Sequence, residues 1–266
     1  AGIPLVVHFH GKDAHCETNL RAHGHYKQLL KEAAAIVVVS RAMEHQLLEL
    51  GAPRERLHYI CYGINVDQFS AGQPADQPPR FLSVGRFTDK KAPLITFLAF
   101  RQAWLERPEA RLTMIGGGDL WESVRQLRAV FGMEMVVELA GVRSPAEVAV
   151  AMKTCRAFVQ HSVTTADNDM EGTPLAVLEA MASGLPVIST RHAGIADVVL
   201  HGERGLLSRE YDLAAMARHM VQLTDDPGLA SDMGKAGRAY AAAAHRVEVQ
   251  VAALQSVIDQ VAGRTG

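Results

Sequence analysis

Strand-length apolar runs alternate with helix-length segments along most of this 266-residue chain. The first cycle begins with the apolar run 3–9, continues through a helical segment at 19–34, and reaches a β-branched run at 35–39. Ser40 then predicts the cap of a short helix, and Ser-Pro-Ala-Glu at 144–147 predicts a capping box with Pro at the first helical position of a later helix. Alternation of this kind is typical of parallel sheets whose strands are joined by helical crossovers. The sequence therefore predicts an α/β fold.

A stretch rich in Pro, Gly and Gln interrupts this alternation. Residues 71–80 are the best candidate for a linker, because this composition disfavours both helices and strands. The alternation restarts after the linker, which predicts two doubly wound domains at 1–70 and 81–245. The last segment, 246–266, predicts a helix with an apolar stripe, and the first domain is one candidate surface for that stripe.

Charge and composition exclude several classes of protein. The formal net charge is −2 and aromatic residues make up 6% of the chain, so neither a basic field nor stacking platforms for nucleic acid are indicated. The three cysteines are odd in number and far apart, which fits a reducing cytoplasm better than a disulfide framework. No apolar run has the length of a membrane-spanning helix. We therefore expect a cytoplasmic protein that does not bind nucleic acid.

Residues 158–194 form the stretch with the most informative polar pattern. They predict a strand, a polar loop, a small-residue helix and a second strand, with Thr173 as the helix N-cap and Pro174 as its first residue. Glu171 lies just before this helix, and Glu179 lies eight residues later on its second turn. Carboxylates around a helix N-terminus that opens into a loop suit a hydroxyl-rich ligand that carries phosphate.

Two cations follow another predicted strand end. Arg86 and Lys91 lie on a loop that starts with glycine and leads into a helix beginning at Pro93. Arginine can bind two phosphate oxygens at once, lysine adds a point charge, and the helix dipole favours an anion. Because ligands of parallel sheets bind at the carboxyl ends of strands, the candidate binding loops are 10–16, 85–91, 116–119, 141–144, 161–173 and 190–194. If loops 85–91 and 161–173 meet at one cleft, these cations also offset the acids of the second loop. The alternative is that these are solvated loop charges.

A glycine run marks a third strand end. Gly116, Gly117 and Gly118 follow a predicted strand and open a helix, but Trp121 stands where the dinucleotide fingerprint requires its third glycine. The run therefore predicts either a tight turn with positive φ or a close approach of the backbone to a ligand.

These motifs together resemble the retaining GT-B glycosyltransferases of family 4, also called group 1 transferases. Glu171 and Glu179 stand in Glu-Gly-Thr-Pro-Leu-Ala-Val-Leu-Glu-Ala-Met-Ala-Ser-Gly-Leu-Pro-Val, which is similar to the family signature. Val-Gly-Arg at 84–86, together with Lys91, resembles the family's diphosphate loop. The sequence of residues 161–181 is most similar to that of family members that build exopolysaccharides of the colanic-acid type.

The resemblance implies a GT-B fold of two Rossmann-like doubly wound domains. It also implies transfer of a sugar from a UDP- or GDP-sugar to a hydroxyl of a saccharide or lipid-linked saccharide, with retention of configuration, in exopolysaccharide synthesis. No cofactor or metal is expected, since the cations and the helix dipole do the work of a metal. Association with the inner face of a membrane and the oligomeric state stay open.

The family also implies roles for single residues. Arg86 and Lys91 are expected to hold the donor diphosphate, Glu179 the ribose hydroxyls, and Glu171 the donor sugar. His10, in His-Gly-Lys-Asp, matches an acceptor-side motif of the family. Further donor contacts are expected from Arg143 beside the base and from Gly172, Thr173, Pro174 and Leu175 near the sugar and phosphate.

Two positions depart from the family pattern, and the start of the chain differs as well. Ala92 follows Lys91 where glycine is usual, and Asp197 replaces a usual Glu. Family members also have further residues before the position at which this sequence starts, so we expect an incomplete N-terminal domain.

Metal binding is the main alternative for the polar residues. The triplet 167–169 imitates half of a calcium loop, but Leu178 stands where that loop needs a bidentate Glu. The same triplet imitates the Asp-x-Asp that holds Mn²⁺ in another glycosyltransferase architecture, although two acids at this spacing are common by chance. Five histidines near the start offer a further metal hypothesis, the alternative being that one or two line a cleft: His8, His10, His15, His23 and His25.

Two other functions stay open at this point. A GT-B relative could epimerise the nucleotide sugar without any acceptor, and an incomplete chain could bind a nucleotide sugar without catalysis. The spacing of Glu171 and Glu179 favours the transferase.

Overall fold

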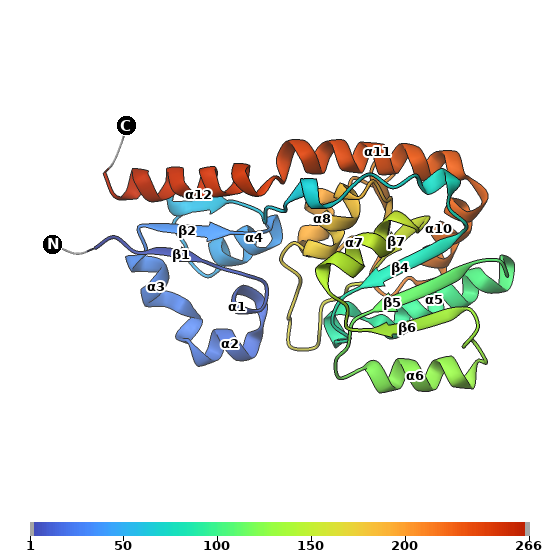
Figure 1. Cartoon of the computed structure of the whole chain (residues 1–266). Coiled ribbons are helices and arrows are strands. Elements are labelled where there is room, and N and C mark those ends of the chain that lie inside the picture. The colour runs from blue at the N-terminus through green and yellow to red at the C-terminus, as the bar shows by residue number, and fades with distance from the viewer. Residues whose placement is uncertain (1–2, 264–266) are drawn as a thin grey trace.

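The computed structural model describes residues 3–263, which form two parallel sheets. The smaller sheet has the strand order β1-β2-β3, and the larger has the order β6-β5-β4-β7-β8-β9. Every strand pair in both sheets is parallel. Figure 1 shows the two sheets side by side, each with its own helices. This confirms the predicted α/β architecture.

The small sheet and its helices come from the first part of the chain. Its strands are β1 (Val6–His8), β2 (Ala35–Val38) and β3 (Leu57–Tyr59). The helices beside it are α1 (Lys12–His15), α2 (Glu17–Ala22), α3 (Lys27–Glu32) and α4 (Arg41–Glu49).

The large sheet is built from the rest of the chain. Its strands are β4 (Arg80–Val84), β5 (Arg111–Ile115), β6 (Val137–Gly141), β7 (Ala157–Val159), β8 (Val187–Thr190) and β9 (Gly205–Ser208). Its helices are α5 (Pro93–Glu106), α6 (Trp121–Val130), α7 (Pro145–Lys153), α8 (Leu175–Ala182), α9 (Ala193–Val198), α10 (Leu213–Asp225) and α11 (Pro227–Ala244). The last helix of the chain is α12 (Val247–Val261).

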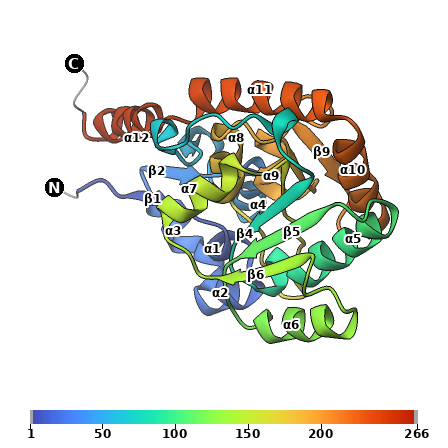
Figure 2. The ribbon, with the colours of Figure 1, turned by 45° about the vertical axis from the view of Figure 1, so that its right-hand side comes forward.

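Successive residues of the large sheet's strands enter different hydrophobic cores. Leu82 packs with α7 and α8 on one face, and its neighbour Phe81 packs with α5 and α10 on the other. Because side chains alternate along a strand, a sheet buried on both faces needs apolar residues at consecutive positions. The sheet is therefore covered by helices on both sides (Figure 2).

Several local signals in the sequence are borne out. Ser144 and Glu147 form the predicted capping box at the start of α7, and Pro145 occupies the first helical position. Ser40 caps α4 by accepting a hydrogen bond from the backbone N–H of Met43. Pro93 begins α5.

The single helix predicted over 19–34 is wrong. The chain instead forms α2, a 3-10 turn at Gly24–Tyr26 and α3, and His25 and Tyr26 have positive φ angles of 54° and 55°. The Tyr26 ring packs edge-on against Phe9, with ring centroids 5.2 Å apart. This tertiary contact outweighs the weak helix propensity of the His-Gly-His-Tyr sequence.

The predicted start of α8 is also corrected. Helix α8 begins at Leu175, Pro174 is its N-cap residue, and no side chain caps it. The Oγ1 of Thr173 accepts no bond from this helix and instead donates a hydrogen bond to the carbonyl of Val39, 2.8 Å away in the N-terminal part of the chain. The hydroxyl therefore ties the two halves of the molecule together.

The last helix returns to the small sheet. Val257 of α12 packs with Ala35, Val37 and Ile60, and Figure 1 shows α12 running along that sheet. At the crossing, the N–H of Ile64 donates to the carbonyl of His245 at 2.8 Å. The segments around Ile64 and His245 therefore run side by side between the two halves of the molecule.

None of the helices within residues 3–263 combines the length and apolar character needed to cross a bilayer.

Candidate functional site

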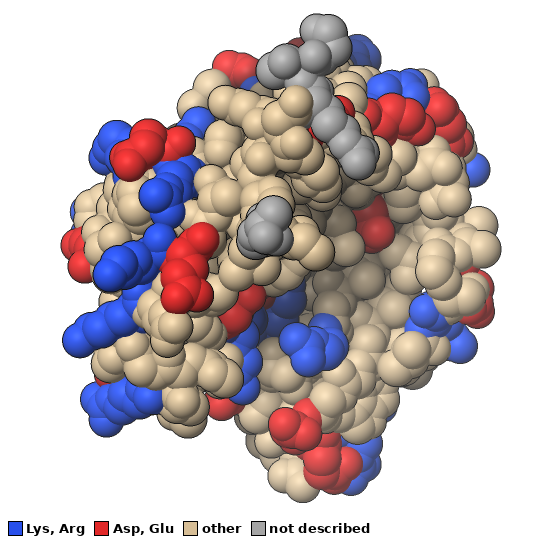
Figure 3. All heavy atoms as spheres, turned by 90° about the vertical axis from the view of Figure 1, so that its left-hand side faces the viewer, with Lys and Arg blue, Asp and Glu red and all other residues tan. Residues whose placement is uncertain are grey.

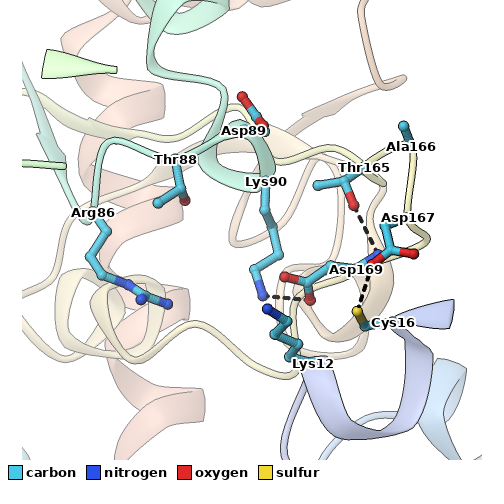
Figure 4. A pocket seen from close by; sticks show the side chains of 10 residues that line it. All are labelled: Lys12, Cys16, Arg86, Thr88, Asp89, Lys90, Thr165, Ala166, Asp167 and Asp169. Atoms are coloured by element: carbon cyan, nitrogen blue, oxygen red, sulfur yellow. Dashed lines mark hydrogen bonds and ion pairs between the residues drawn. The ribbon is translucent and has the colours of Figure 1, made fainter. Parts of the chain in front are cut away.

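Three loops that follow strands meet between the two sheets. They come after β1, β4 and β7, at the carboxyl edges where parallel sheets bind ligands. They enclose a cavity of about 400 Å³ (Figure 4) lined by Lys12, Cys16, Arg86, Thr88, Asp89, Lys90, Thr165, Ala166, Asp167 and Asp169. The end view in Figure 3 shows a hollow in the surface, with acidic and basic side chains within it.

Two ion pairs join the loop after β4 to the loop after β7. Lys91 Nζ lies 2.9 Å from Glu171 Oε1, and Lys90 Nζ lies 2.9 Å from Asp169 Oδ1. The side chains of Lys91 and Glu171 are only 17% and 9% exposed, so water screens their attraction weakly. The structure thus brings loops 85–91 and 161–173 together with their opposite charges matched.

Arg86 differs from its two lysine neighbours. It is exposed and lines the cavity, and within residues 3–263 no carboxylate lies within ion-pair distance of its guanidinium. In Figure 4 its side chain extends into the cavity on the side opposite Asp167. A cation of this kind beside matched pairs leaves a position for one anionic ligand group.

The glycine run after β5 supports the Arg86 loop. A Cβ at Gly116 would lie 1.8 Å from the carbonyl oxygen of Gly85, and one at Gly118 would lie 2.6 Å from that of Phe87. Both glycines have positive φ angles, 141° and 147°. The run therefore forms a turn with positive φ, one of the two predicted alternatives, and this turn packs closely on the backbone of the Arg86 loop.

Asp167 is engaged by the N-terminal half of the molecule. Its Oδ1 accepts from the N–H of Thr18 at 3.1 Å, its Oδ2 from the Cys16 thiol at 2.9 Å, and its carbonyl from the N–H of Glu17 at 2.9 Å. Hydrogen bonds from Cys16 and Thr18 hold the pKa of Asp167 below its usual value.

Within residues 3–263 no group of three or more His, Cys, Asp or Glu side chains is arranged to hold a metal ion.

His10 is presented at the cleft by its own loop. Its backbone N–H donates to Asp13 at 2.8 Å, and its Nδ1 lies 2.8 Å from the hydroxyl of Tyr62, whose ring stacks on the imidazole. Burial raises the pKa of Tyr62 to about 12, so the phenol stays neutral. A Cβ at Gly11 would come within 3.4 Å of the N–H of Gly172. His10 therefore lies beside the start of the signature segment.

Glu179 lies in a second cavity, of about 530 Å³. That cavity is lined by Gln68, Phe69, Ser144, Pro145, Ala146, Ala149 and Glu179. Burial raises the pKa of Glu179. Arg143 is exposed and lines a different cavity of about 200 Å³, so the structure does not place it with Glu179, although its neighbour Ser144 is there.

The first turn of α8 faces the solvent in part. Leu175 is 48% exposed, whereas Gly172 and Thr173 are buried. An added Cβ at Gly194, in α9, would lie 2.0 Å from the carbonyl of Gly172, so α9 packs directly against the segment that precedes α8. The sequence-predicted residues 172–175 therefore form a tightly supported entry to this helix.

Sequence reasoning named none of four side chains of this region as site residues, although two of them, Lys90 and His192, lie in loops that it had selected. Lys90, Tyr62, His192 and Glu210 all contact predicted site residues or their loops. His192 follows β8 at the carboxyl edge of the sheet, which is a usable signal. Glu210 carries no such signal, because only the folded turn after β9 brings it to loop 161–173.

The sequence matches two family models. The model described as "Glycosyl transferases group 1" matches residues 66–240. The model described as "Glycosyl transferase 4-like domain" matches residues 1–63.

The chain is similar to two curated proteins of exopolysaccharide synthesis. It is 33% identical over 222 residues to the amylovoran biosynthesis glycosyltransferase AmsK of Erwinia amylovora, covering 82% of this chain and 54% of that protein. It is 33% identical over 221 residues to WcaL of Escherichia coli K12, which is named for colanic acid biosynthesis, with the same coverages of 82% and 54%. The chain thus spans about half the length of the curated relatives it matches.

Among solved structures, the chain resembles HepE of Anabaena in complex with UDP and glucose. The TM-score is 0.81, the sequence identity is 19%, and the likeness covers 98% of this chain and 72% of that one. At this identity the likeness shows a shared fold.

Proposed function

The chain belongs to the group 1 glycosyl transferases and has their GT-B fold, and on this premise we propose its reaction. It transfers a sugar from a nucleoside diphosphate sugar to a hydroxyl of a saccharide or lipid-linked saccharide, with retention of configuration, in exopolysaccharide synthesis in the cytoplasm. The observation that carries the proposal is the meeting of loops 85–91 and 161–173, with Arg86 free of any carboxylate partner among the described residues.

In this proposal the two cations of loop 85–91 hold the donor diphosphate. Arg86 is available to it at once, whereas Lys91 is paired with Glu171 until the ligand arrives. The diphosphate carries more charge than one carboxylate, so it draws Lys91 away and frees Glu171 for the sugar. Fixed positive charge at the leaving diphosphate lowers the barrier more effectively than water does, because it needs no reorganisation during the reaction.

The two carboxylates of the signature then bind hydroxyl groups. Glu171 positions the donor sugar, and Glu179 takes the ribose hydroxyls in its own cavity. The backbone of residues 172–175 lies near the sugar and phosphate, and Arg143 lies beside the base. His10 is on the acceptor side. No metal or other cofactor is part of the proposal.

Two donor bases stay open, uracil and guanine. HepE is described in complex with UDP and glucose, which makes UDP-sugars the first donors to try. Because the chain covers 54% of its relatives' length, binding of a nucleotide sugar without transfer is a specific second candidate.

Product analysis tests the proposal. The protein is incubated with UDP- and GDP-sugars and a panel of saccharide acceptors, and the products are examined by NMR. A new glycoside with the anomeric configuration of the donor supports the proposal. An inverted linkage contradicts retention, an epimerised nucleotide sugar indicates an epimerase, and donors that bind but return unchanged indicate the second candidate.

A further inference from the structure

Two side chains that have no role in the reaction above hold both ends of loop 161–173, His192, which is buried, and Glu210, which is partly buried. Glu210, in the turn between β9 and α10, accepts hydrogen bonds from the N–H of Thr164 at 2.8 Å and from its hydroxyl at 3.2 Å. The same carboxylate lies 2.6 Å from Nδ1 of His192. His192 Nε2 in turn accepts from the backbone N–H of Glu171 at 3.0 Å.

These contacts fix the protonation of the imidazole. A backbone N–H can only donate, so Nε2 of His192 must be unprotonated. The ring proton therefore sits on Nδ1 and is donated to the Glu210 carboxylate. The side chain of His192 is 0% exposed, so water cannot replace either bond.

The hydrogen bond from the Glu171 N–H to His192, called the backbone clamp below, matters because the ion-pair partner of the Glu171 side chain also binds the ligand in the proposed reaction. Lys91 is the cation that pairs with the Glu171 carboxylate, and in the proposed reaction it moves to the diphosphate. The carboxylate would then depend on its backbone for its position. Gly194 supports the next residue by close packing on the carbonyl of Gly172, which leaves the Glu171 N–H as the point that needs a polar partner.

We propose that His192 is a positioning residue that fixes the Glu171 backbone, with Glu210 setting the tautomer of its imidazole, so that the Glu171 carboxylate meets the donor sugar after Lys91 has turned to the diphosphate. This rests on the proposed function, because it assigns the sugar contact to Glu171. It extends the site to two residues that do not touch the ligand. It also predicts that loss of the acceptor for the Glu171 N–H affects recognition of the sugar more than recognition of the nucleotide.

Two substitutions of one residue separate the two hydrogen bonds. In His192→Gln the side-chain oxygen reaches the position of Nε2 and still accepts from the Glu171 N–H. In His192→Asn the amide reaches only the position of Nδ1, so the contact with Glu210 survives and the Glu171 N–H loses its acceptor. The readout is the affinity for a UDP- or GDP-sugar divided by the affinity for the bare nucleotide, measured by calorimetry.

We expect His192→Asn to lower this ratio roughly tenfold and His192→Gln to keep it within about twofold of the native value. Hydrogen exchange at the Glu171 amide gives a ligand-free readout: it should quicken in His192→Asn and stay slow in His192→Gln. His201→Ala is the matched control, since His201 Nδ1 also accepts a backbone N–H, from Leu207 at 2.9 Å, but has no contact with the loop. It should reduce stability and leave the ratio unchanged.

The outcomes are distinct. Equal ratios in both His192 variants, or a lowered ratio in His201→Ala as well, would overturn the positioning role and leave the proposed function standing. A native protein that binds no nucleotide sugar would overturn both. Slow exchange at the Glu171 amide in His192→Asn would show that the clamp is not what holds this backbone.

Discussion

At the scale of single residues, the cleft is organised by matched and unmatched charge. Lys90 and Lys91 each have a carboxylate partner from the opposite loop, whereas Arg86 lines the cavity and has no such partner among the described residues. The acidic side chains already have structural tasks, since Asp167 caps α2 and Asp169 pairs with Lys90. Arg86 is therefore the residue from which a nucleotide would gain most.

The first prediction compares Arg86 with Asp167. Arg86→Ala removes charged hydrogen bonds worth about 1.5–3 kcal/mol, so nucleotide affinity should fall by about 10–100-fold in calorimetric titration. Asp167 lines the same cavity, but its side chain accepts a hydrogen bond from the start of α2. Asp167→Ala should therefore leave the nucleotide affinity within about threefold of the native value. If Asp167→Ala had the larger effect and Mn²⁺ were required for binding, the acidic triplet would be a metal site after all.

The second prediction concerns Glu179. Burial raises its pKa from the usual 4.5, so the ionised form destabilises the fold above the folded-state pKa, and this cost disappears below pH 4.5. Glu179→Gln should therefore raise the melting temperature at pH 7.5 and lose that advantage near pH 4. The same variant should bind the nucleotide more weakly. An unchanged melting temperature of Glu179→Gln at pH 7.5 would mean that burial does not destabilise the ionised carboxylate.

At the scale of elements, local sequence signals predicted those parts of the fold that local chemistry controls. The capping box of α7, the Ser40 cap of α4 and the Pro93 start of α5 depend on residues within one turn of each other. The break at Gly24–Tyr26 and the start of α8 depend on contacts with Phe9 and Val39, which are distant in sequence. No pattern in a short window could have predicted them.

The third prediction concerns Ala92, which follows loop 85–91. Its φ of 37° and ψ of 54° lie in the left-handed region, which costs an L-residue roughly 1–2 kcal/mol and glycine very little. Part of that gain is offset by the greater freedom of glycine in the unfolded chain. Ala92→Gly should therefore stabilise the protein by up to about 1 kcal/mol in urea unfolding, with unchanged nucleotide affinity. A loss of stability would contradict the left-handed conformation.

At the scale of the whole molecule, the site exists only where the two halves meet. The sequence predicted which loops would lie at the strand ends, because parallel sheets gather their carboxyl ends at one edge. It did not predict the bonds between the halves, from Thr173 to Val39 and from Thr18 to Asp167, because these depend on how two independent sheets pack. It missed Glu210 because only the folded turn after β9 brings this residue to loop 161–173.

The fourth prediction concerns acid stability. Burial lowers the pKa of both His15 and His161 to about 4 from the usual 6.5. Between pH 6.5 and about pH 4 these two histidines bind protons in the unfolded chain but not in the folded protein. The free energy of unfolding therefore falls as the pH drops through this range. His161→Gln keeps an acceptor for the N–H of Tyr211 and removes the titrating group. In this variant the free energy of unfolding should depend less steeply on pH between about 4 and 6.5. An unchanged pH dependence would contradict the lowered pKa of His161.

The central claim is that the cleft between the two sheets binds a nucleoside diphosphate sugar. Thermal unfolding of the purified protein with UDP- and GDP-sugars tests it most directly. At about a hundred times the Kd, the ligand adds about 2.7 kcal/mol to the free energy of unfolding, which raises the melting temperature by roughly 5–10 °C. We predict such a shift with at least one of these donors and its loss in Arg86→Ala. A protein that melts cooperatively at the same temperature with every UDP- and GDP-sugar would contradict the claim.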